Sequence, residues 1–533
     1  MWFQWKKQLK KTTKRNEQSG QEKNGINRTV ESELQRNIET VRNTTGNSVD
    51  VVIRRFLLGK EEGIPAALLF VSGIVDEEMI HQFLLESVVQ LTVPSSYCRE
   101  EALVYIEQKI AAAGKMKRIK RWSELFLALM SGEVILLIDG VPEALSVEAK
   151  GGERRAIEEP VTQLSIRGPR EGFTESLATN VAMVRRRIQN PHLWLEAITI
   201  GEVTQTNVSI MYIKGIASDE IVEEVRRRLQ RIRIDGILES GYIEQLIEDQ
   251  TFTTFPTVYH TERPDSVAAN LLEGRIAIFV EGTPFVLIAP TVFIQFFQVV
   301  EDYYARFDIA TALRFLRVLV FFISLVAPSV YIAATTFHQE MIPTQLVIAI
   351  AAQRESVPFP AFVEALMMEV TFEILREAGV RLPRAVGQAV SIVGALVIGQ
   401  ATVEAGFVSS AMVIVVSITA IASFATPSFA IAISARLIRF LLMVLAALFG
   451  FYGILIGIVL MTLHLCSLRS FGVPYMSPLA PLILSNIRDT LVRFPMWALT
   501  ERPRLINQTN MVRQGNDQRP KPPNQPEKEG DNH

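Results

Sequence analysis

Hydrophobic and polar residues are distributed very unevenly along this chain. Between about residue 50 and Arg317, apolar and charged positions alternate, as they do in a folded water-soluble region. Residues 318–337 then carry no charge and are long enough for a helix to cross a bilayer. Glu404 is the only charged residue between Arg384 and Arg436. The pattern predicts a polar α/β half joined to an apolar, all-helical membrane half.

The apolar half predicts an even number of membrane crossings. Arginines flank it on both sides, so the positive-inside rule places both of its ends in the cytoplasm. Four crossings are the primary interpretation, with a tight turn at Ala405-Gly406. Six follow if residues 342–352 also cross and the last span is hinged at Gly450-Phe-Tyr-Gly453. The four expected spans are residues 318–337, 386–403, 407–425 and 440–466.

The polar half contains an internal duplication. LFVSGIVDEEMI (69–80) matches MYIKGIASDEIV (211–222), and LMSGEVILLIDGVPEAL (129–145) matches LLEGRIAIFVEGTPFVL (271–287). Both matches have the same offset, 142 positions. Each copy reads as strand, glycine turn, helix and a hairpin that turns at Asp-Gly or Glu-Gly. The sequence therefore predicts two related α/β subdomains.

Composition and motifs argue against several classes of function. The chain has 533 residues, of which 49% are hydrophobic and 21% charged, with a net charge of −2. This balance argues against a nucleic-acid partner, and two cysteines exclude a disulfide framework. The sequence has no Walker A motif, no dinucleotide glycine fingerprint and no nucleophile elbow. We therefore expect no enzyme activity, no cofactor and no metal site.

These observations divide the chain into six segments. The first is basic, with a charge of about +7 over residues 1–60, and is expected to be disordered. The last is polar. The predicted segments are a head (1–49), subdomain 1 (50–150), a connecting segment (151–189), subdomain 2 (190–300), a transmembrane helical domain (301–495) and a C-terminal tail (496–533).

Three glutamates recur every four residues within 359–380, on one face of a predicted amphipathic helix: Glu369, Glu373 and Glu377. Like charges at this spacing weaken an isolated helix. In a ring of subunits they would form an acidic vestibule that concentrates cations. The alternative is an interfacial helix whose acids face water, with Glu377 paired to Arg381.

A second polar stripe lies on the 386–403 span. Such a stripe either lines a water-filled path or lets another helix pack closely. Glu404 lies on another face of this helix than the stripe, and an ionisable group within a membrane span is functional by default. Gly453 and Gly457 form a GxxxG pattern that favours helix packing. The stripe comprises Gln388, Ser391, Ala395, Gly399 and Thr402.

The connecting segment contains LSIRGPREGFTESLATN (164–180), in which charged residues surround a Gly-Pro turn. Thr174 is placed to cap the helix that follows. The segment is either a joint that docks a neighbouring subunit or an anion, or a solvated loop with weak ion pairs. The residues assigned to this joint are Arg167, Gly168, Pro169, Arg170, Glu171 and Asn180.

Four stretches together resemble one known family. They are IRGPREGFTE (166–175), PFPAFVEALMMEVTFEILREAGVRLPR (358–384), GQAVSIVGALVIGQATVEAG (387–406) and HLCSLRSFGVPYMSPLAP (464–481). They are similar to the GerA family, the A subunits of spore germinant receptors. The resemblance covers roughly residues 50–500. GerK-type A subunits and the paralogue SpoVAF are both open alternatives.

The resemblance implies a multi-pass protein in the inner spore membrane, with its large N-terminal region on the cytoplasmic (core) side and in contact with lipid. It implies a transporter-like B subunit that binds the nutrient and a C-subunit lipoprotein as partners. It also implies a homo-oligomeric ring that acts as a nutrient-gated cation channel. A non-conducting scaffold or signal-relay subunit, and a SpoVAF-like accessory channel, are the alternatives.

Overall fold

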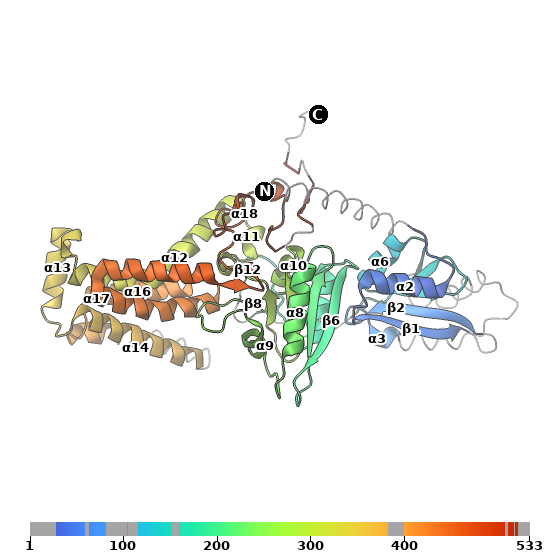
Figure 1. The fold of residues 1–533 in the computed structure, drawn as a ribbon, viewed down its shortest axis with the longest axis horizontal. Helices are drawn as coiled ribbons and strands as arrows, with labels where there is room; N and C mark the ends of the chain where they lie inside the picture. Colours follow the sequence, from blue (N-terminus) through green and yellow to red (C-terminus); the bar gives the residue numbers. More distant parts are fainter. Residues whose placement is uncertain are drawn as a thin grey trace, which may run out of the picture.

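A computed structural model describes most of the chain. Figure 1 shows its three parts in a row: a first α/β subdomain, a second α/β subdomain in the middle, and a helical region at the opposite end. This arrangement confirms the predicted fold class. The described residues are 28–58, 63–80, 104, 116–151, 159–160, 163, 165–381, 399–506, 510–515 and 518–520.

Subdomain 1 is built on a five-stranded antiparallel sheet of order β1-β2-β4-β5-β3. Helix α6 lies in the sequence between β3 and β4, and its Trp122, Leu125 and Leu129 are buried in the core. The elements are β1 (Val51–Leu58), β2 (Ile64–Val71), α3 (Glu77–Met79), β3 (Met116–Ile119), α6 (Trp122–Met130), β4 (Glu133–Ile138) and β5 (Ala144–Glu148).

Helix α2 (Leu34–Thr45) precedes this sheet and corrects the expected disordered head over its length. Leu34, Ile38 and Val41 share one face of the helix and are buried in the core of subdomain 1. These three apolar residues have helical spacing, but the many polar residues around them hid this pattern in the sequence. Residues 1–27 lie outside the described part of the chain.

Subdomain 2 repeats the same sheet with the order β6-β7-β9-β10-β8. Leu68 pairs with Leu136 in the first sheet, and Ile210 pairs with Ile278 in the second. Both partners are shifted by the sequence offset of 142, which confirms the duplication at the level of strand register. The elements are β6 (Leu193–Ile200), β7 (Thr206–Ile213), α8 (Asp219–Arg231), α9 (Ser240–Ile247), β8 (Tyr259–Thr261), α10 (Pro264–Leu272), β9 (Ile276–Val280) and β10 (Val286–Ala289).

The helical region begins with α12 (Phe307–Thr336), which leads away from subdomain 2 (Figure 1). We call the end beside subdomain 2 the near end and the opposite end the far end. The remaining elements are η3 (Phe293–Phe297), α11 (Glu301–Tyr304), η4 (Gln339–Met341), α13 (Thr344–Arg354), α14 (Ala361–Arg381), α16 (Ser410–Phe424), α17 (Phe429–Ser467), β11 (Arg469–Ser470), β12 (Val473–Pro474), α18 (Leu484–Ile487) and η5 (Met496–Ala498).

Helix α17 is a hairpin of two legs, 429–449 and 451–467, joined at Gly450. Gly450 has φ 58° and ψ −139°, which a residue with a Cβ rarely adopts. Both ends of the hairpin reach subdomain 2, because Ser434 donates to the Thr254 carbonyl and His464 lies 2.9 Å from Thr253 Oγ1. Of the two expected alternatives for the last span, the hinged one is therefore the one adopted.

Contacts at the near and far ends show in which direction the other helices run. Tyr331, near the far end of α12, lies 3.2 Å from Ser409, which caps the start of α16. Arg376, near the end of α14, donates to Ser423 in the last turn of α16. Helices α14 and α16 therefore both run from the far end to the near end. Two described helices are long and apolar enough to cross a membrane, α12 and α17, and α16 is a shorter apolar helix.

Candidate functional site

The single turn of α11 connects the duplicated region to the helical region. Its four consecutive residues contact four different parts of the chain. Glu301 Oε1 accepts a hydrogen bond from the Ile166 amide at 2.7 Å, and the Tyr304 hydroxyl donates to Asp265 at 2.9 Å. Asp302 and Tyr303 face the base of α12 and the C-terminal segment. We call this set of contacts the joint.

Asp302 holds the base of α12 at the joint. It is 1% exposed and accepts from Arg314 Nε at 2.9 Å and from Arg317 Nη1 at 2.8 Å. Arg314 is also 1% exposed and donates to the Thr490 carbonyl at 3.0 Å. A buried ion pair resists separation, because removing one partner leaves an uncompensated charge in a dry site.

Asp489 supplies the second carboxylate of the joint. Arg314 Nη1 lies 3.1 Å from its Oδ1, and the Tyr303 hydroxyl donates to its Oδ2 at 2.8 Å. Burial raises the pKa of Asp489, and the positive charge of Arg314 only partly offsets this rise. Burial, with the nearby charge of Asp489, also holds the pKa of Tyr303 well above its usual value. Tyr303 is therefore a hydrogen-bond donor at any physiological pH.

The IRGPREGFTE stretch (166–175), called the signature from here on, docks against α11 within its own chain. Gly168 has φ 136°, and a Cβ there would lie 2.6 Å from the Tyr304 ring, so a glycine is required. The Pro169 carbonyl accepts from Arg263, whose guanidinium pairs with Asp265 at 2.7 Å. The structure places the chain's own α11 against Gly168, and the docking of a neighbouring subunit or an anion at this segment stays a prediction.

The remaining charged residues of the signature are arranged around it at the surface. Arg170 pairs with Glu159 at 3.2 Å, and Glu171 pairs with Arg187 at 2.7 Å. Arg167 is exposed. These pairs correspond to the solvated ion pairs of the alternative interpretation, and exposed pairs of this kind contribute little stability.

Helix α7 (Leu177–Arg187) follows the signature and connects the two subdomains. Asn180 is buried and fixes the preceding chain by hydrogen bonds to both the amide and the carbonyl of Thr174. Thr174 is therefore not the cap of the helix; Ser176 caps it by accepting from the Thr179 amide. At the other end, Arg185 makes two hydrogen bonds with Asp50 of subdomain 1, at 2.7 and 2.9 Å.

The glutamate stripe of α14 is not a water-facing row, and this corrects both expectations for its first two members. Glu369 is 0% exposed and accepts from Arg439 of α17 at 2.5 Å. Glu373 accepts from Arg436 at 2.8 Å. Only Glu377 is exposed and pairs with Arg381, as the interfacial alternative expects. Like charges are tolerated here because each of the first two faces an arginine on α17, which a reading of α14 alone cannot detect.

A fourth acid of α14 was missed by the sequence analysis. Glu364 is 0% exposed, accepts from the Ser409 hydroxyl at 2.9 Å, and lies 3.5 Å from Arg354. Its spacing to Glu369 differs from that of the stripe, so periodicity gave no signal. Together Glu364, Glu369 and Glu373 form a series of buried or half-buried carboxylates from the far end of α14 toward the near end. We call it the charge series.

The other predicted path residues are only partly described. Gln388 and Ser391 lie outside the described residues. Thr402 donates to the Gly399 carbonyl at 3.1 Å, and the exposed Glu404 accepts from Gln400 at 2.8 Å. The structure brings neither of them to the charge series. Within the described ranges, no cluster of three or more His, Cys, Asp or Glu is placed to hold a metal ion.

Gly453 and Gly457 lie inside the α17 hairpin. A Cβ on Gly453 would lie 2.0 Å from the Leu445 carbonyl oxygen, and one on Gly457 would lie 2.4 Å from a methyl carbon of Leu442. Both contacts join the two legs of α17. The glycines therefore let these legs approach each other closely.

Comparison with known proteins identifies the family to which this chain belongs. The profile of the Bacillus/Clostridium GerA spore germination proteins matches residues 39–505. The chain belongs to the GerA spore germination family. It is 60% identical to Spore germination protein KA of Bacillus subtilis, over 92% of this chain and 90% of that protein. It is 44% identical to the membrane protein YfkQ of Bacillus subtilis, over 91% of this chain and 93% of that protein.

A third relative is Spore germination protein GerLA of Bacillus cereus, 38% identical over 90% of this chain and 96% of that protein. Among solved structures, the N-terminal domain of the A subunit of the Bacillus megaterium spore germinant receptor GerK3 is 47% identical. The match covers 50% of this chain and 98% of that structure, with a TM-score of 0.41. The family membership supports a role in spore germination.

The residues of the joint were also missed by the sequence analysis. The signal available was the polar run EDYYARF (301–307) placed directly before an apolar helix, followed by Arg314 and Arg317 within it. These residues were assigned only to membrane orientation. Their partner Asp489 is far away in the sequence, and no local pattern connects it to them.

Proposed function

We propose that this chain is the A subunit of a nutrient germinant receptor and acts without catalysing a reaction. The observation that carries the proposal is the 60% identity to Spore germination protein KA over at least nine-tenths of both chains. A transporter-like B subunit that binds the nutrient and a C-subunit lipoprotein are its proposed partners. The absence of catalytic motifs in the sequence is consistent with a role in transmitting a signal.

The proposed location is the inner spore membrane, with the two α/β subdomains on the cytoplasmic side. The apolar helices α12 and α17 support crossings, and α12 begins and α17 ends at the near end. Arg376 also lies toward that end, beside Ser423. Six crossings then include α14 in place of the expected crossing by residues 342–352, because α13 begins and ends at the far end. This arrangement puts Arg376 on the cytoplasmic side, in accordance with the positive-inside rule. The near end is thus the proposed cytoplasmic face.

Within this membrane region, the proposed activity is nutrient-gated cation conduction by a ring of A subunits. The charge series supports it, because ionisable groups inside a membrane region most often serve ion or proton pathways. Each pair in the series also leaves polar atoms without a partner among the described residues, including Glu369 Oε1 and Arg439 Nε. Such atoms need water or an ion, which favours a hydrated interior.

A genetic experiment separates a receptor subunit from an accessory paralogue. Deleting the gene should abolish germination in response to one class of nutrient and leave other responses intact. A uniform slowing of all responses would favour an accessory role of the SpoVAF kind. Complementation with the wild-type gene is the control for effects on neighbouring genes.

A flux experiment separates a channel from a relay. The purified protein is placed in liposomes, with and without its receptor partners, and monovalent cation release is measured. Thr402→Phe or Glu373→Gln should change the flux, while Ser417→Phe, on the exposed face of α16, should not. If no oligomer of the protein conducts cations under any of these conditions, the non-conducting scaffold or relay role replaces the channel.

A further inference from the structure

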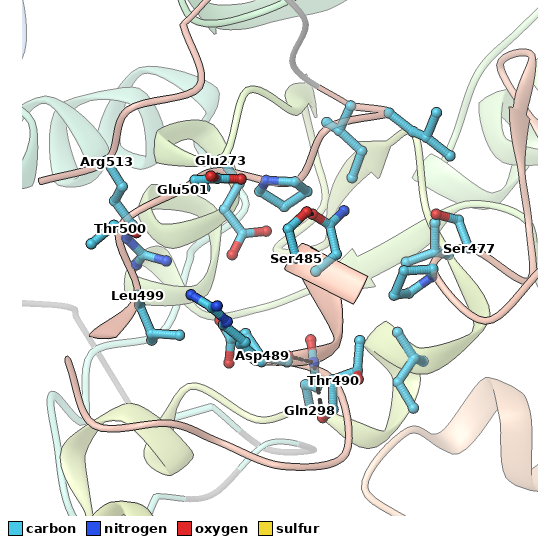
Figure 2. A pocket seen from close by; sticks show the side chains of 18 of the residues that line it. Glu273, Gln298, Ser477, Ser485, Asp489, Thr490, Leu499, Thr500, Glu501 and Arg513 are labelled. Atoms are coloured by element: carbon cyan, nitrogen blue, oxygen red, sulfur yellow. Dashed lines mark hydrogen bonds between the residues drawn. The ribbon is translucent and has the colours of Figure 1, made fainter. Parts of the chain in front are cut away.

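A pocket lies between subdomain 2 and the C-terminal segment, next to the joint. Its cavity volume is about 80 Å³, and it is partly open to solvent. Figure 2 shows Arg513, Glu273 and Asp489 around the same space, contributed by the C-terminal segment, the loop before β9 and the turn after α18. Neither the germination role nor the channel proposal uses this pocket.

The charges that line the pocket are not balanced. Its three acids already have cationic partners: Glu273 lies 3.5 Å from Arg275, Asp489 lies 3.1 Å from Arg314, and Glu501 lies 3.0 Å from Arg504. In contrast, within the described part of the chain the guanidinium groups of Arg488 and Arg513, which also line the pocket, have neither a hydrogen-bond nor an ion-pair partner. The two unpaired charges are both positive.

Arg275 adds a buried cation to the wall of the pocket. It is 4% exposed and donates to the Pro290 carbonyl at 2.8 Å and to the Gln295 side chain, while its Nε lies 3.5 Å from Glu273 Oε2 without a hydrogen bond to it. Burial lowers its pKa despite the nearby charge of Glu273. A buried guanidinium with so long an ion pair is incompletely compensated, and an additional negative charge nearby would stabilise it.

We propose that this pocket binds a small organic anion whose carboxylate or phosphate group lies among Arg275, Arg488 and Arg513. Guanidinium groups suit such oxyanions because their N–H donors match the geometry of two oxygens. Hydroxyl groups of Ser477, Ser485 and Thr500 on the same walls would bind polar groups elsewhere on the ligand. The paired acids would receive donors from it.

The position of the pocket gives the ligand a route to the joint. Asp489 and Thr490 line the pocket, and both also accept hydrogen bonds from Arg314 at the base of α12. A ligand that attracts Arg488 would pull on the segment that holds these acceptors. The pocket is therefore an effector site, and its existence does not depend on whether the helical region conducts ions.

The test is a titration of the full-length protein in detergent with sodium phosphate and, separately, sodium succinate. Sodium chloride of equal ionic strength is the control for screening. The double substitution Arg488→Gln and Arg513→Gln should weaken binding of at least one probe by about tenfold or more, the effect of losing a charge-assisted hydrogen bond. The matched control is Arg231→Gln with Arg233→Gln, two exposed arginines on and after α8.

A second measurement guards against misfolding of the variant. In the wild-type protein, the bound probe should slow hydrogen exchange of amides in residues 485–490 and leave those of β4 unchanged. Preference for phosphate or succinate identifies the oxyanion. The proposal is wrong if the wild-type protein binds neither probe at about 10 mM, a very weak affinity, or if the arginine variant binds as well as the control variant.

Discussion

The two α/β subdomains share strand order and register but differ in what surrounds them. The core of subdomain 1 contains residues from its own sheet and helices, together with Ala182 of α7. The core of subdomain 2 continues without a break into the helical region and includes Phe321 of α12 and Ile431 and Leu465 of α17. Subdomain 1 has a nearly self-contained core, whereas subdomain 2 shares its core with the helical region.

This difference assigns different mechanical roles to two copies of one fold. Subdomain 2 moves with the helical region, because separating them would expose a shared apolar core and the buried charges of the joint. Subdomain 1 is connected through α7, mainly by the Arg185–Asp50 pair and contacts with the start of β6. Subdomain 1 is therefore placed to move relative to subdomain 2 and to transmit that movement through α7. The same fold is fixed to the helical region in one copy and joined through a single helix in the other.

The largest expected effect comes from breaking the attachment of subdomain 2. Asp302→Ala leaves Arg314 and Arg317 without their shared carboxylate and should destabilise the protein by about 3–5 kcal/mol. Thermal unfolding of the purified protein in detergent measures this. Asp308→Ala removes a nearby exposed acid that pairs with Arg306 and accepts from the Ile309 amide, and it should lower the unfolding midpoint much less. Equal effects of the two substitutions would show that the joint does not hold α12.

Breaking the attachment of subdomain 1 should have a more local effect. Asp50→Ala strands the buried Arg185 at a cost of about 3 kcal/mol, at the lower end for a buried pair because only one arginine is affected. We expect a protease to release subdomain 1 faster, while cleavage within subdomain 2 is unchanged. Glu171→Ala, which breaks the exposed pair with Arg187, is the control. Faster cleavage in both subdomains would contradict their separation.

A change inside the α17 hairpin should reach subdomain 2 but not subdomain 1. Gly453→Ala places a Cβ against the Leu445 carbonyl, a backbone atom that cannot move aside, and should cost about 1–3 kcal/mol. Gly457→Ala meets only the flexible side chains of Leu442 and Leu445 and should cost less. The order of the two unfolding midpoints tests the packing of the legs. The reverse order would mean that the legs are not packed as described.

The smallest expected effect sharpens the boundary of the shared core. The buried Tyr475 donates to the Pro256 carbonyl at 2.7 Å and packs against Phe293. Tyr475→Phe keeps the ring and removes one hydrogen bond, so it should cost about 1 kcal/mol. Tyr242→Phe, on the exposed face of α9, is the matched control and should show no change. A loss several times larger than expected would indicate that the hydroxyl has a further role.

Much of the fold could be predicted from the sequence because its signals are local or repeated. The hairpin turns at Gly140 and Gly282 were predicted from their dipeptides, and both glycines have positive φ. The hinge at Gly450 was one of two interpretations of an apolar run longer than a single crossing needs. Repetition at a constant offset revealed the second sheet once the first was proposed. These features need only a window of residues or a comparison of two windows.

The candidate site could not be predicted in the same way, because its partners are distant in the sequence. The stripe of α14 was found, but its meaning depends on Arg436 and Arg439 of another helix. Arg314 and Asp489 meet only when the C-terminal segment folds back onto α12. Helical periodicity reports which residues share a face. It does not report whether that face meets water, lipid or an arginine.

The most direct test of the central claim is native-state hydrogen exchange of the purified protein across a denaturant series. The claim is that subdomain 2 and the helical region form one cooperative unit and that subdomain 1 forms another. Amides of β9, α12 and α17 should then exchange with one common opening free energy, and amides of β4 and β5 with a different one. If β9 and β10 open together with β4 and β5, independently of α12, the claim is wrong.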